Sequence, residues 1–324
     1  MGDEARDEMA ALWSAMAADA DAAGDVDGAR LLVALAAGRV DAESPAAVEH
    51  AVAGLAPPAR ADALVAVARG WSLAGHERAE AFLAAALEHV PDHLEAKLTL
   101  AQVRMPGPGY YELLDRLHEL IRPRTYLEIG MGDGSSMALA RPGTLAVGVD
   151  PVPRLCSPVA AECRIFPERS EDFFARGDLD AVFAGRPPDL VFIDGLHTFP
   201  AVLADLAGAE RIAGPDTVVV LHDLLPLDEP TQRAERAEGF YTGDVWKLLP
   251  CLAAERPDLD VLTVRTAPSG LTFVRGLTPG GTQLADRHRD LVAAFGDLPY
   301  DPATAPTGDV PADAWDEVVA FLGR

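Results

Sequence analysis

The sequence has little positive charge and no long apolar run. Its 324 residues include 27 Lys and Arg against 51 Asp and Glu, a formal net charge of −24. Because nucleic acids and anionic membranes are held by clusters of Lys and Arg, we expect neither as a partner. The longest apolar stretches, such as 31–37 and 217–221, fall far short of the roughly 20 residues that cross a bilayer. A membrane-spanning protein is therefore not expected.

Cysteine is scarce as well, and its spacing is uninformative. Cys156, Cys163 and Cys251 form no CxxC pair, so neither a disulfide framework nor a cysteine-zinc site is indicated. Residues 1–20 carry acidic side chains where a secretory signal needs positive charge and an apolar run. We therefore expect a cytoplasmic protein. With 49% hydrophobic residues the chain can bury a large core, which excludes wholesale disorder.

The first part of the chain, residues 1–105, is predicted to be an all-α domain. Ala, Leu and Glu dominate it at helical spacing, without β-branched runs. Between Trp71 and Pro91, small and aromatic residues follow a spacing that resembles a tetratricopeptide repeat: Ala74, Gly75, Ala79, Phe82 and Ala86. Stacked repeats need about three units for a stable core. We therefore expect these helices to pack on the next domain rather than to form a peptide-binding array.

A second domain is predicted over residues 106–276. The Pro- and Gly-rich segment 105–109 marks its start, and an amphipathic helix over 110–121 follows. Short apolar runs then alternate with helical stretches, which indicates parallel strands covered on both faces: 125–129, 145–149, 164–166, 189–193 and 217–221. The runs 260–265 and 271–274 flank a tight-turn sequence and predict an antiparallel hairpin at the sheet edge.

The predicted fold class is therefore α/β, a doubly wound, mostly parallel seven-stranded sheet with an antiparallel edge hairpin, after an all-α amino-terminal domain. Residues 277–324 form a carboxyl-terminal helical extension, with helices near 283–295 and through Trp315. Its expected role is packing or contact within a homo-oligomer.

The turn after the first strand is rich in glycine. Gly130, Gly132 and Gly134 alternate there, and their backbone can approach a ligand closely because no Cβ stands in the way. The second strand ends at Asp150, a carboxylate placed to pair with ribose hydroxyls; the alternative is an Asp that caps a following helix. The other residues expected to contact a cofactor stand in this turn or at the ends of the third and fourth strands: Ser135, Ser170, Glu171 and Asp194.

Over Tyr110 to Arg275 the chain resembles the class I S-adenosylmethionine-dependent methyltransferases. The resemblance is carried by Glu128-x-Gly130-x-Gly132-x-Gly134, by Asp150 and by the strand that ends at Asp194. It implies S-adenosylmethionine as cofactor, with Glu128 facing the methionine ammonium group. Glu128 would repel a pyrophosphate, so a nicotinamide dinucleotide is the weaker interpretation.

Two further segments bear on the reaction. Asp194 and His197 follow the fourth strand, and His222 and Asp223 follow the fifth, so the four side chains can converge on one rim of the sheet. Together with 242–247 these segments resemble metal-dependent O-methyltransferases that modify macrolides and similar natural products. The resemblance implies a metal held by Asp194, His222 and Asp223. Because imidazole suits softer metals than Mg²⁺, another divalent ion, a site of two Asp, or no metal all stay open.

A hydroxyl acceptor must lose its proton, which needs a Lewis acid or a base within about 3 Å. His197 is the preferred base, with His222 as its substitute and Asp223 beside it. Residues 227–241 are expected to form a mobile lid, and Asp244 the N-cap of the helix that follows. The residues expected to contact a small-molecule substrate are Tyr110, Tyr111, Trp246 and Lys247.

The expected function is methyl transfer from S-adenosylmethionine to a hydroxyl of a sugar or polyketide-like molecule. Three alternatives stay open because fold does not fix function. They are N-methylation, a non-methylating S-adenosylmethionine-bound enzyme such as a cyclase, and a scaffold protein whose cofactor fold is vestigial.

Overall fold

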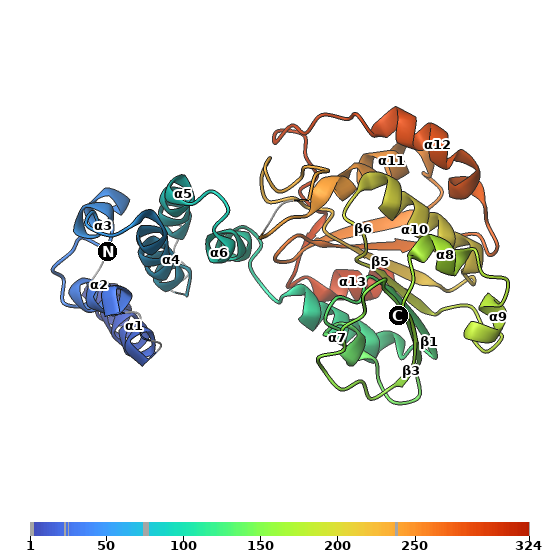
Figure 1. The fold of residues 1–324 in the computed structure, drawn as a ribbon, viewed down its shortest axis with the longest axis horizontal. Helices are drawn as coiled ribbons and strands as arrows, with labels where there is room; N and C mark the ends of the chain where they lie inside the picture. Colours follow the sequence, from blue (N-terminus) through green and yellow to red (C-terminus); the bar gives the residue numbers. More distant parts are fainter. Residues whose placement is uncertain (1–2, 23, 25, 74–77, 237–238, 324) are drawn as a thin grey trace. The chain divides into compact units, whose positions relative to one another are not determined.

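The computed structural model describes residues 3–22, 24, 26–73, 78–236 and 239–323. The chain divides into two compact units (Figure 1). Met1–Arg104 makes up most of the first, and Met105–Ala237 with Tyr241–Arg324 forms the second. The carboxyl-terminal extension therefore belongs to the second unit. No helix among the described residues is long and apolar enough to cross a membrane.

The first unit is entirely helical where it is described. Its helices are α1 (Asp3–Ala22), α2 (Val26–Ala36), α3 (Pro45–Ala51), α4 (Pro57–Leu73), α5 (Ala79–His89) and α6 (Leu94–Arg104). Trp71 lies at the centre, fully buried, with its indole nitrogen donating to the Ala42 carbonyl and its ring meeting Trp13 edge-on. Ala74 and Gly75 of the predicted repeat lie outside the described residues. The repeat assignment stays a prediction.

The second unit contains an eight-stranded sheet in the order β3-β2-β1-β4-β5-β7-β6-β8. Five strands are parallel: β1 (Thr125–Ile129), β2 (Leu145–Val149), β3 (Glu162–Phe166), β4 (Leu190–Ile193) and β5 (Val218–His222). β7 (Leu271–Arg275) runs antiparallel to both β5 and β6 (Asp260–Arg265). The predicted doubly wound α/β fold is confirmed, and every predicted strand is present.

An eighth strand, β8 (Val310–Pro311), corrects the predicted edge. It pairs in parallel with β6, so the hairpin of β6 and β7 lies one strand in from the edge. Asp309 makes the connection, because its side chain accepts from the Thr263 backbone N–H and its own N–H donates to the Thr263 carbonyl. A two-residue strand that contains proline leaves no alternating pattern from which it could be predicted.

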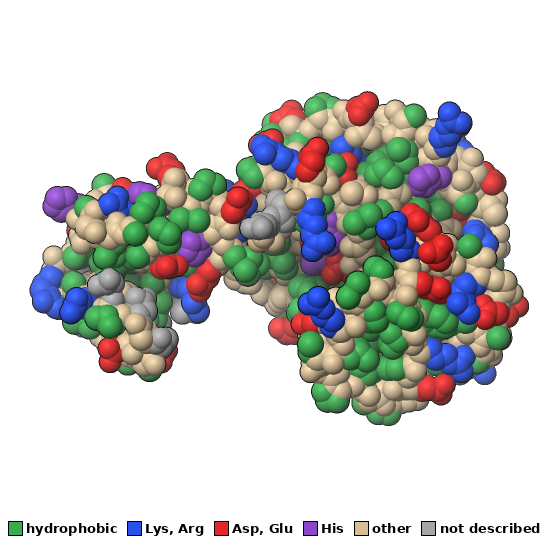
Figure 2. Space-filling model, viewed as in Figure 1, with side chains coloured by type: hydrophobic (Ala, Val, Ile, Leu, Met, Phe, Trp, Pro, Cys, Tyr) green, Lys and Arg blue, Asp and Glu red, His purple; other side chains and the backbone are tan. Residues whose placement is uncertain are grey.

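Helices cover both faces of the sheet, as Figure 1 shows. One face packs against α7 (Tyr110–Ile121) and α13 (Trp315–Phe321). The opposite face packs against α8 (Ser170–Phe174), α9 (Leu179–Val182), α10 (Phe199–Ile212), α11 (Leu248–Glu255) and α12 (Gln283–Phe295). β1, β2, β4 and β5 are buried along their whole length, which explains why their sequences are apolar except at Thr125, Glu128 and His222. On the face shown in Figure 2, acidic and basic side chains of this unit intermingle.

Candidate active site

In the glycine-rich loop after β1, two glycines are needed for close packing and one borders open space. Gly130, Gly132 and Gly134 all have positive φ, at 83°, 53° and 80°. A Cβ on Gly130 would collide with the backbone carbonyl of Asp194, and one on Gly134 would lie 2.7 Å from Leu155. A Cβ on Gly132 would meet nothing within 4 Å. Packing therefore explains the first and third glycines, whereas the central one borders open space.

The loop leads into a short 3₁₀ helix, η1 (Met137–Leu139), although the predicted alternation of strands and helical stretches implied an α-helix between the first two strands. Asp150 ties this loop to the end of β2. Its two carboxylate oxygens accept from the backbone N–H groups of Gly132, at 3.1 Å, and Val152, at 2.7 Å. No helix follows Asp150 before β3, so the alternative interpretation as a helix cap is wrong.

The residues predicted near an adenine lie at the start of α8. Ser170 hydrogen-bonds to the buried Asp205 of α10, and burial raises the pKa of that carboxyl to about 6. Glu171 is exposed beside it. Ser135 lies in the glycine-rich loop, where its backbone N–H donates to the Asp133 side chain.

Glu128 is fully buried in β1, on the face covered by α7. Its carboxylate accepts from the hydroxyl of Tyr126 at 2.7 Å and from that of Ser136 at 2.5 Å. Burial outweighs these two hydrogen bonds and raises the pKa of Glu128 to about 8. Its role toward a methionine ammonium group stays a prediction.

Asp194, His197, His222 and Asp223 lie together at the carboxyl ends of β4 and β5. His222 Nδ1 is 3.4 Å from Asp194 Oδ1 and 3.3 Å from Asp223 Oδ1. His197 lies on the other side of the same carboxylates, with Nε2 3.4 Å from Asp194 Oδ1 and Nδ1 3.2 Å from Asp223 Oδ2. Asp223 has a positive φ of 69°, a conformation that Asp tolerates better than most residues. Two acids and two imidazoles therefore share one site.

The charges in this cluster hold one another in place. Burial would lower the pKa of His197, but the negative charges of Asp223 and Asp194 outweigh it and raise that pKa to about 9. Burial likewise opposes ionisation of Asp194, yet the positive charges of His222 and His197 hold the pKa of Asp194 well below its usual range. Burial and the charge of Asp194 outweigh the two imidazoles at Asp223 and raise its pKa. The site therefore favours positive charge beside its two carboxyl groups, which protons supply when no other cation does.

Four more residues lie at this site: Tyr110 and Tyr111, which were predicted as substrate contacts, and Ser269 and Tyr241, which the sequence did not single out. Ser269, fully buried in the turn between β6 and β7, donates its hydroxyl to Asp223 Oδ1 and lies 3.3 Å from His222 Nε2. Tyr110 stacks on the His222 ring at 4.2 Å, with Tyr111 beside it and 41% exposed. Tyr241 at the end of the predicted lid stacks on the His197 ring, and its carbonyl faces His197 Nδ1 at 3.2 Å. The lid residues 237 and 238 lie outside the described part of the chain.

Trp246 and Lys247 lie elsewhere, in the 3₁₀ helix η2 (Gly243–Lys247). The buried ammonium group of Lys247 contacts Asp244 at 2.9 Å and donates to the Gly296 carbonyl. The Trp246 indole donates to Gln232 and meets Tyr300 edge-on. The substrate contacts of Lys247 and Trp246 stay predictions; in the structure their polar groups bind these internal partners. Asp244 is not the N-cap of its own helix, since it accepts from the Phe199 N–H and so caps α10.

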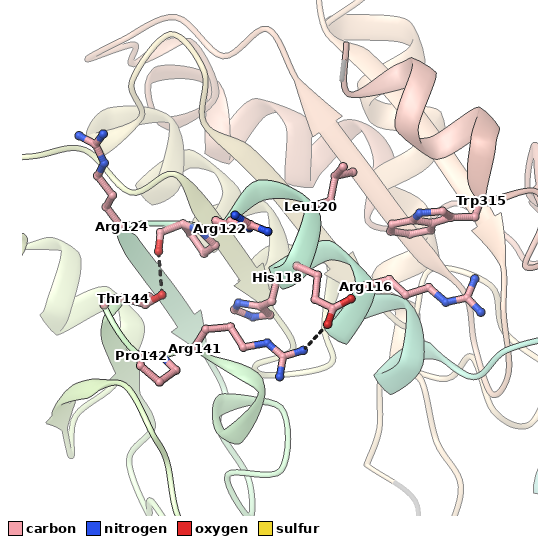
Figure 3. A pocket seen from close by; sticks show the side chains of 12 residues that line it. Arg116, His118, Leu120, Arg122, Arg124, Arg141, Pro142, Thr144 and Trp315 are labelled. Atoms are coloured by element: carbon pink, nitrogen blue, oxygen red, sulfur yellow. Dashed lines mark hydrogen bonds and ion pairs between the residues drawn. The ribbon is translucent and has the colours of Figure 1, made fainter.

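A cavity of about 800 Å³ lies at the opposite end of the strands, where Arg124 and Thr144 precede β1 and β2 (Figure 3). Arg141 on its wall already pairs with Asp115 and Glu119. His118 is buried there, and burial lowers its pKa to about 4. The residues that line this cavity include no counterpart of the carboxylate and imidazole cluster at the carboxyl edge.

Residues 127–224 match the model of a family described as a methyltransferase domain. The matched segment begins in β1 and runs through the glycine-rich loop, Asp150 and the whole acid and imidazole cluster. The second unit therefore contains a methyltransferase domain over residues 127–224, as the resemblance implied.

Several solved structures are similar to this domain in part. An O-methyltransferase from Streptomyces achromogenes, TomG, is 19% identical over 52% of this chain and 79% of its own, with a TM-score of 0.37. An O-methyltransferase from Bacillus cereus is 18% identical over 58% and 94%, also with a TM-score of 0.37. A methyltransferase from Podospora anserina is 14% identical over 62% and 96%, with a TM-score of 0.40. No curated protein sequence matches this chain.

Proposed function

We propose that the protein transfers a methyl group from S-adenosylmethionine to a hydroxyl of a small molecule. The observation that carries this proposal is the position of the acid and imidazole cluster directly beside the glycine-rich loop. The two touch, because Gly130 packs against the backbone of Asp194. A donor held on the loop would therefore present its reactive carbon to the residues able to take a proton from an acceptor.

The donor-binding part of the proposal rests on three features. The open space above Gly132 leaves room for a ligand at the loop. Asp150 lies next to that space, since it bonds to the Gly132 N–H, and we assign it to the ribose hydroxyls. Ser170 and Glu171 would line the adenine side. Glu128, protonated below about pH 8 in the fold, would lose its proton on binding and so balance the positive charge of the methionine end.

The cluster also fits a divalent cation. Ligand atoms of Asp194, His197 and Asp223 all lie within 4.8 Å of one another. His222 Nδ1 is buried without a hydrogen-bond partner and faces the same two carboxylates. We assign Asp194, Asp223 and His222 as the residues that would hold the ion. A bound cation would act as a Lewis acid that makes an acceptor hydroxyl easier to deprotonate.

His197 is then the base. Its Nδ1 lies between two acceptors, the Tyr241 carbonyl and Asp223 Oδ2, so that nitrogen must carry a hydrogen. Without a cation the two carboxylates raise the pKa of His197 to about 9 and keep Nε2 protonated. A cation between the carboxylates would cancel that effect and leave Nε2 free to receive the proton of the acceptor. The His197 side chain is 27% exposed, against 6% for His222, so His197 is the imidazole that a substrate can reach.

The acceptor class follows from the two segments that resemble natural-product O-methyltransferases, which favour a sugar or a polyketide-like molecule. Tyr110 and Tyr111 are the aromatic residues of the predicted substrate set that lie at the cluster. The helical first unit stays assigned to a single tetratricopeptide-like repeat with flanking helices.

The test is turnover of candidate hydroxylated substrates by the full chain, read as a product mass increased by one methylene. Calorimetry with S-adenosylmethionine measures donor binding separately. Failure to bind the donor would refute the proposal and favour a scaffold role. Undiminished turnover in a chelator, after metal removal has been confirmed by elemental analysis, would refute the metal assignment of Asp194, Asp223 and His222 while leaving methyl transfer intact.

A further inference from the structure

The buried side chain of Ser269 contacts both His222 and Asp223, the two site residues at the end of β5. It lies in the turn before β7, and β7 pairs with β5 so that Leu271 lies opposite His222. This register places the turn over the carboxyl end of β5. The Ser269 hydroxyl reaches Asp223 Oδ1 and lies 3.3 Å from His222 Nε2, and the residue is fully buried.

These contacts fix where the protons lie. An ionised carboxylate only accepts hydrogen bonds, so the single hydrogen of the Ser269 hydroxyl points to Asp223. The hydroxyl then offers only a lone pair to His222, and His222 must donate from Nε2. When His222 gives up its second proton, the neutral imidazole carries one hydrogen, so its Nδ1 is left with a lone pair.

That lone pair meets no hydrogen-bond donor among the residues that the structure describes. His222 Nδ1 is buried without a hydrogen-bond donor, and the atoms that face it are the carboxylate oxygens Asp194 Oδ1 and Asp223 Oδ1, at 3.4 and 3.3 Å. Three lone-pair atoms at such separations repel one another. Adjacent ligands of an octahedral ion with bonds of 2.0–2.1 Å lie roughly 3 Å apart, so the same separations suit a shared cation.

We propose that Ser269 is a positioning residue that fixes the His222 ring and its tautomer, so that Nδ1 becomes the third ligand of a divalent cation beside Asp194 and Asp223. This inference rests on the metal assignment made under the proposed function. Tyr110 supports the same orientation, because its ring stacks on His222 at 4.2 Å and prevents the imidazole from tilting.

The experiment compares cation binding by the wild type, Ser269→Ala and Thr266→Val, each as the full chain, in calorimetric titrations with Co²⁺ and Mg²⁺. Thr266→Val is the matched control, since it removes another buried hydroxyl close to the same turn, one that donates to the Pro108 carbonyl and not to the cluster. Loss of a residue that orients a metal ligand typically weakens metal binding by about 10- to 100-fold.

We expect Ser269→Ala to bind Co²⁺ at least about tenfold more weakly, and Mg²⁺ less than about threefold more weakly, because imidazole contributes more to softer ions. Thr266→Val should bind both ions like the wild type. Equal losses for both ions in Ser269→Ala would indicate a general structural effect and overturn the inference. Wild-type binding of both ions by Ser269→Ala would overturn it too.

A spectroscopic readout follows the tautomer directly. In protein labelled with ¹⁵N-histidine and loaded with diamagnetic Zn²⁺, His222 should show a protonated Nε2 and an unprotonated Nδ1. Ser269→Ala should lose the slowly exchanging Nε2 proton. A protonated Nδ1 in the loaded wild type, or absence of cation binding by the wild type, would refute the role of Ser269. Calorimetry with S-adenosylmethionine in the same samples shows whether the donor-binding proposal stands independently.

Discussion

Gly130 and Gly132 allow the structural and the ligand-binding roles of the loop to be separated by one substitution each. Ala at position 132 must adopt a left-handed backbone conformation, which costs roughly 1–2 kcal/mol. Part of this cost is offset because Ala lowers the conformational entropy of the unfolded chain. Its Cβ meets no atom of the protein within 4 Å. We therefore expect Gly132→Ala to lower the free energy of unfolding by about 1 kcal/mol and to keep the fold.

Gly130→Ala adds a collision with the Asp194 backbone, where neither β1 nor β4 can move aside within the sheet. Overpacking of this kind typically costs about 1–3 kcal/mol beyond the conformational cost. We expect a total destabilisation of about 3 kcal/mol or more. Urea unfolding followed by circular dichroism measures both variants against the wild type.

The two variants should rank in the opposite order for the specific effect on donor binding. In folded Gly132→Ala the methyl group occupies the space assigned to S-adenosylmethionine, so calorimetric affinity should fall at least about tenfold, or 1.4 kcal/mol. Wild-type affinity in Gly132→Ala would refute the loop as a ligand contact. A stability of Gly130→Ala equal to that of Gly132→Ala would refute the packing argument.

Three more predictions test other parts of the domain. Asp150→Ala should weaken S-adenosylmethionine binding at least about tenfold in calorimetry, and unchanged affinity would contradict the ribose assignment. Because the pKa of Glu128 is about 8 in the fold and lower when unfolded, the folded state holds an extra proton between about pH 4.5 and 8. The free energy of unfolding should therefore fall by about 1.4 kcal/mol per pH unit as the pH rises through this window. Glu128→Gln should remove this pH dependence, measured by urea unfolding at several pH values. The same pH dependence in the variant and the wild type would show that Glu128 is ionised when folded. Lys247→Met leaves the buried Asp244 carboxylate without its ion-pair partner and should lower the free energy of unfolding by about 3–5 kcal/mol. In a double-mutant cycle, Lys247→Met/Asp244→Asn should recover part of this loss. A loss below about 1 kcal/mol for Lys247→Met would show that the pair is not buried in solution.

Local sequence was sufficient for much of this domain. Strands buried on both faces are mostly apolar, so runs of apolar residues predicted their positions closely. The alternating glycines and the acidic residues at strand ends could also be recognised as site candidates from the sequence, because the carboxyl ends of parallel strands in a doubly wound sheet lie along one edge. The convergence of Asp194, His197, His222 and Asp223 follows from that rule and from the adjacency of β4 and β5.

What required tertiary structure were contacts between segments distant in sequence. Ser269 reads as a turn residue until the pairing of β7 with β5 places it over His222. From the sequence, Lys247 was predicted to contact substrate and Asp244 to cap its own helix. In the structure, Asp244 accepts from the first N–H of α10, and Lys247 donates to the carbonyl of Gly296 at the end of α12. Sequence periodicity predicts which face of a helix or strand is buried. It does not predict which polar group of a distant segment lies opposite, because hydrogen bonds and ion pairs depend on atomic positions set by the whole fold.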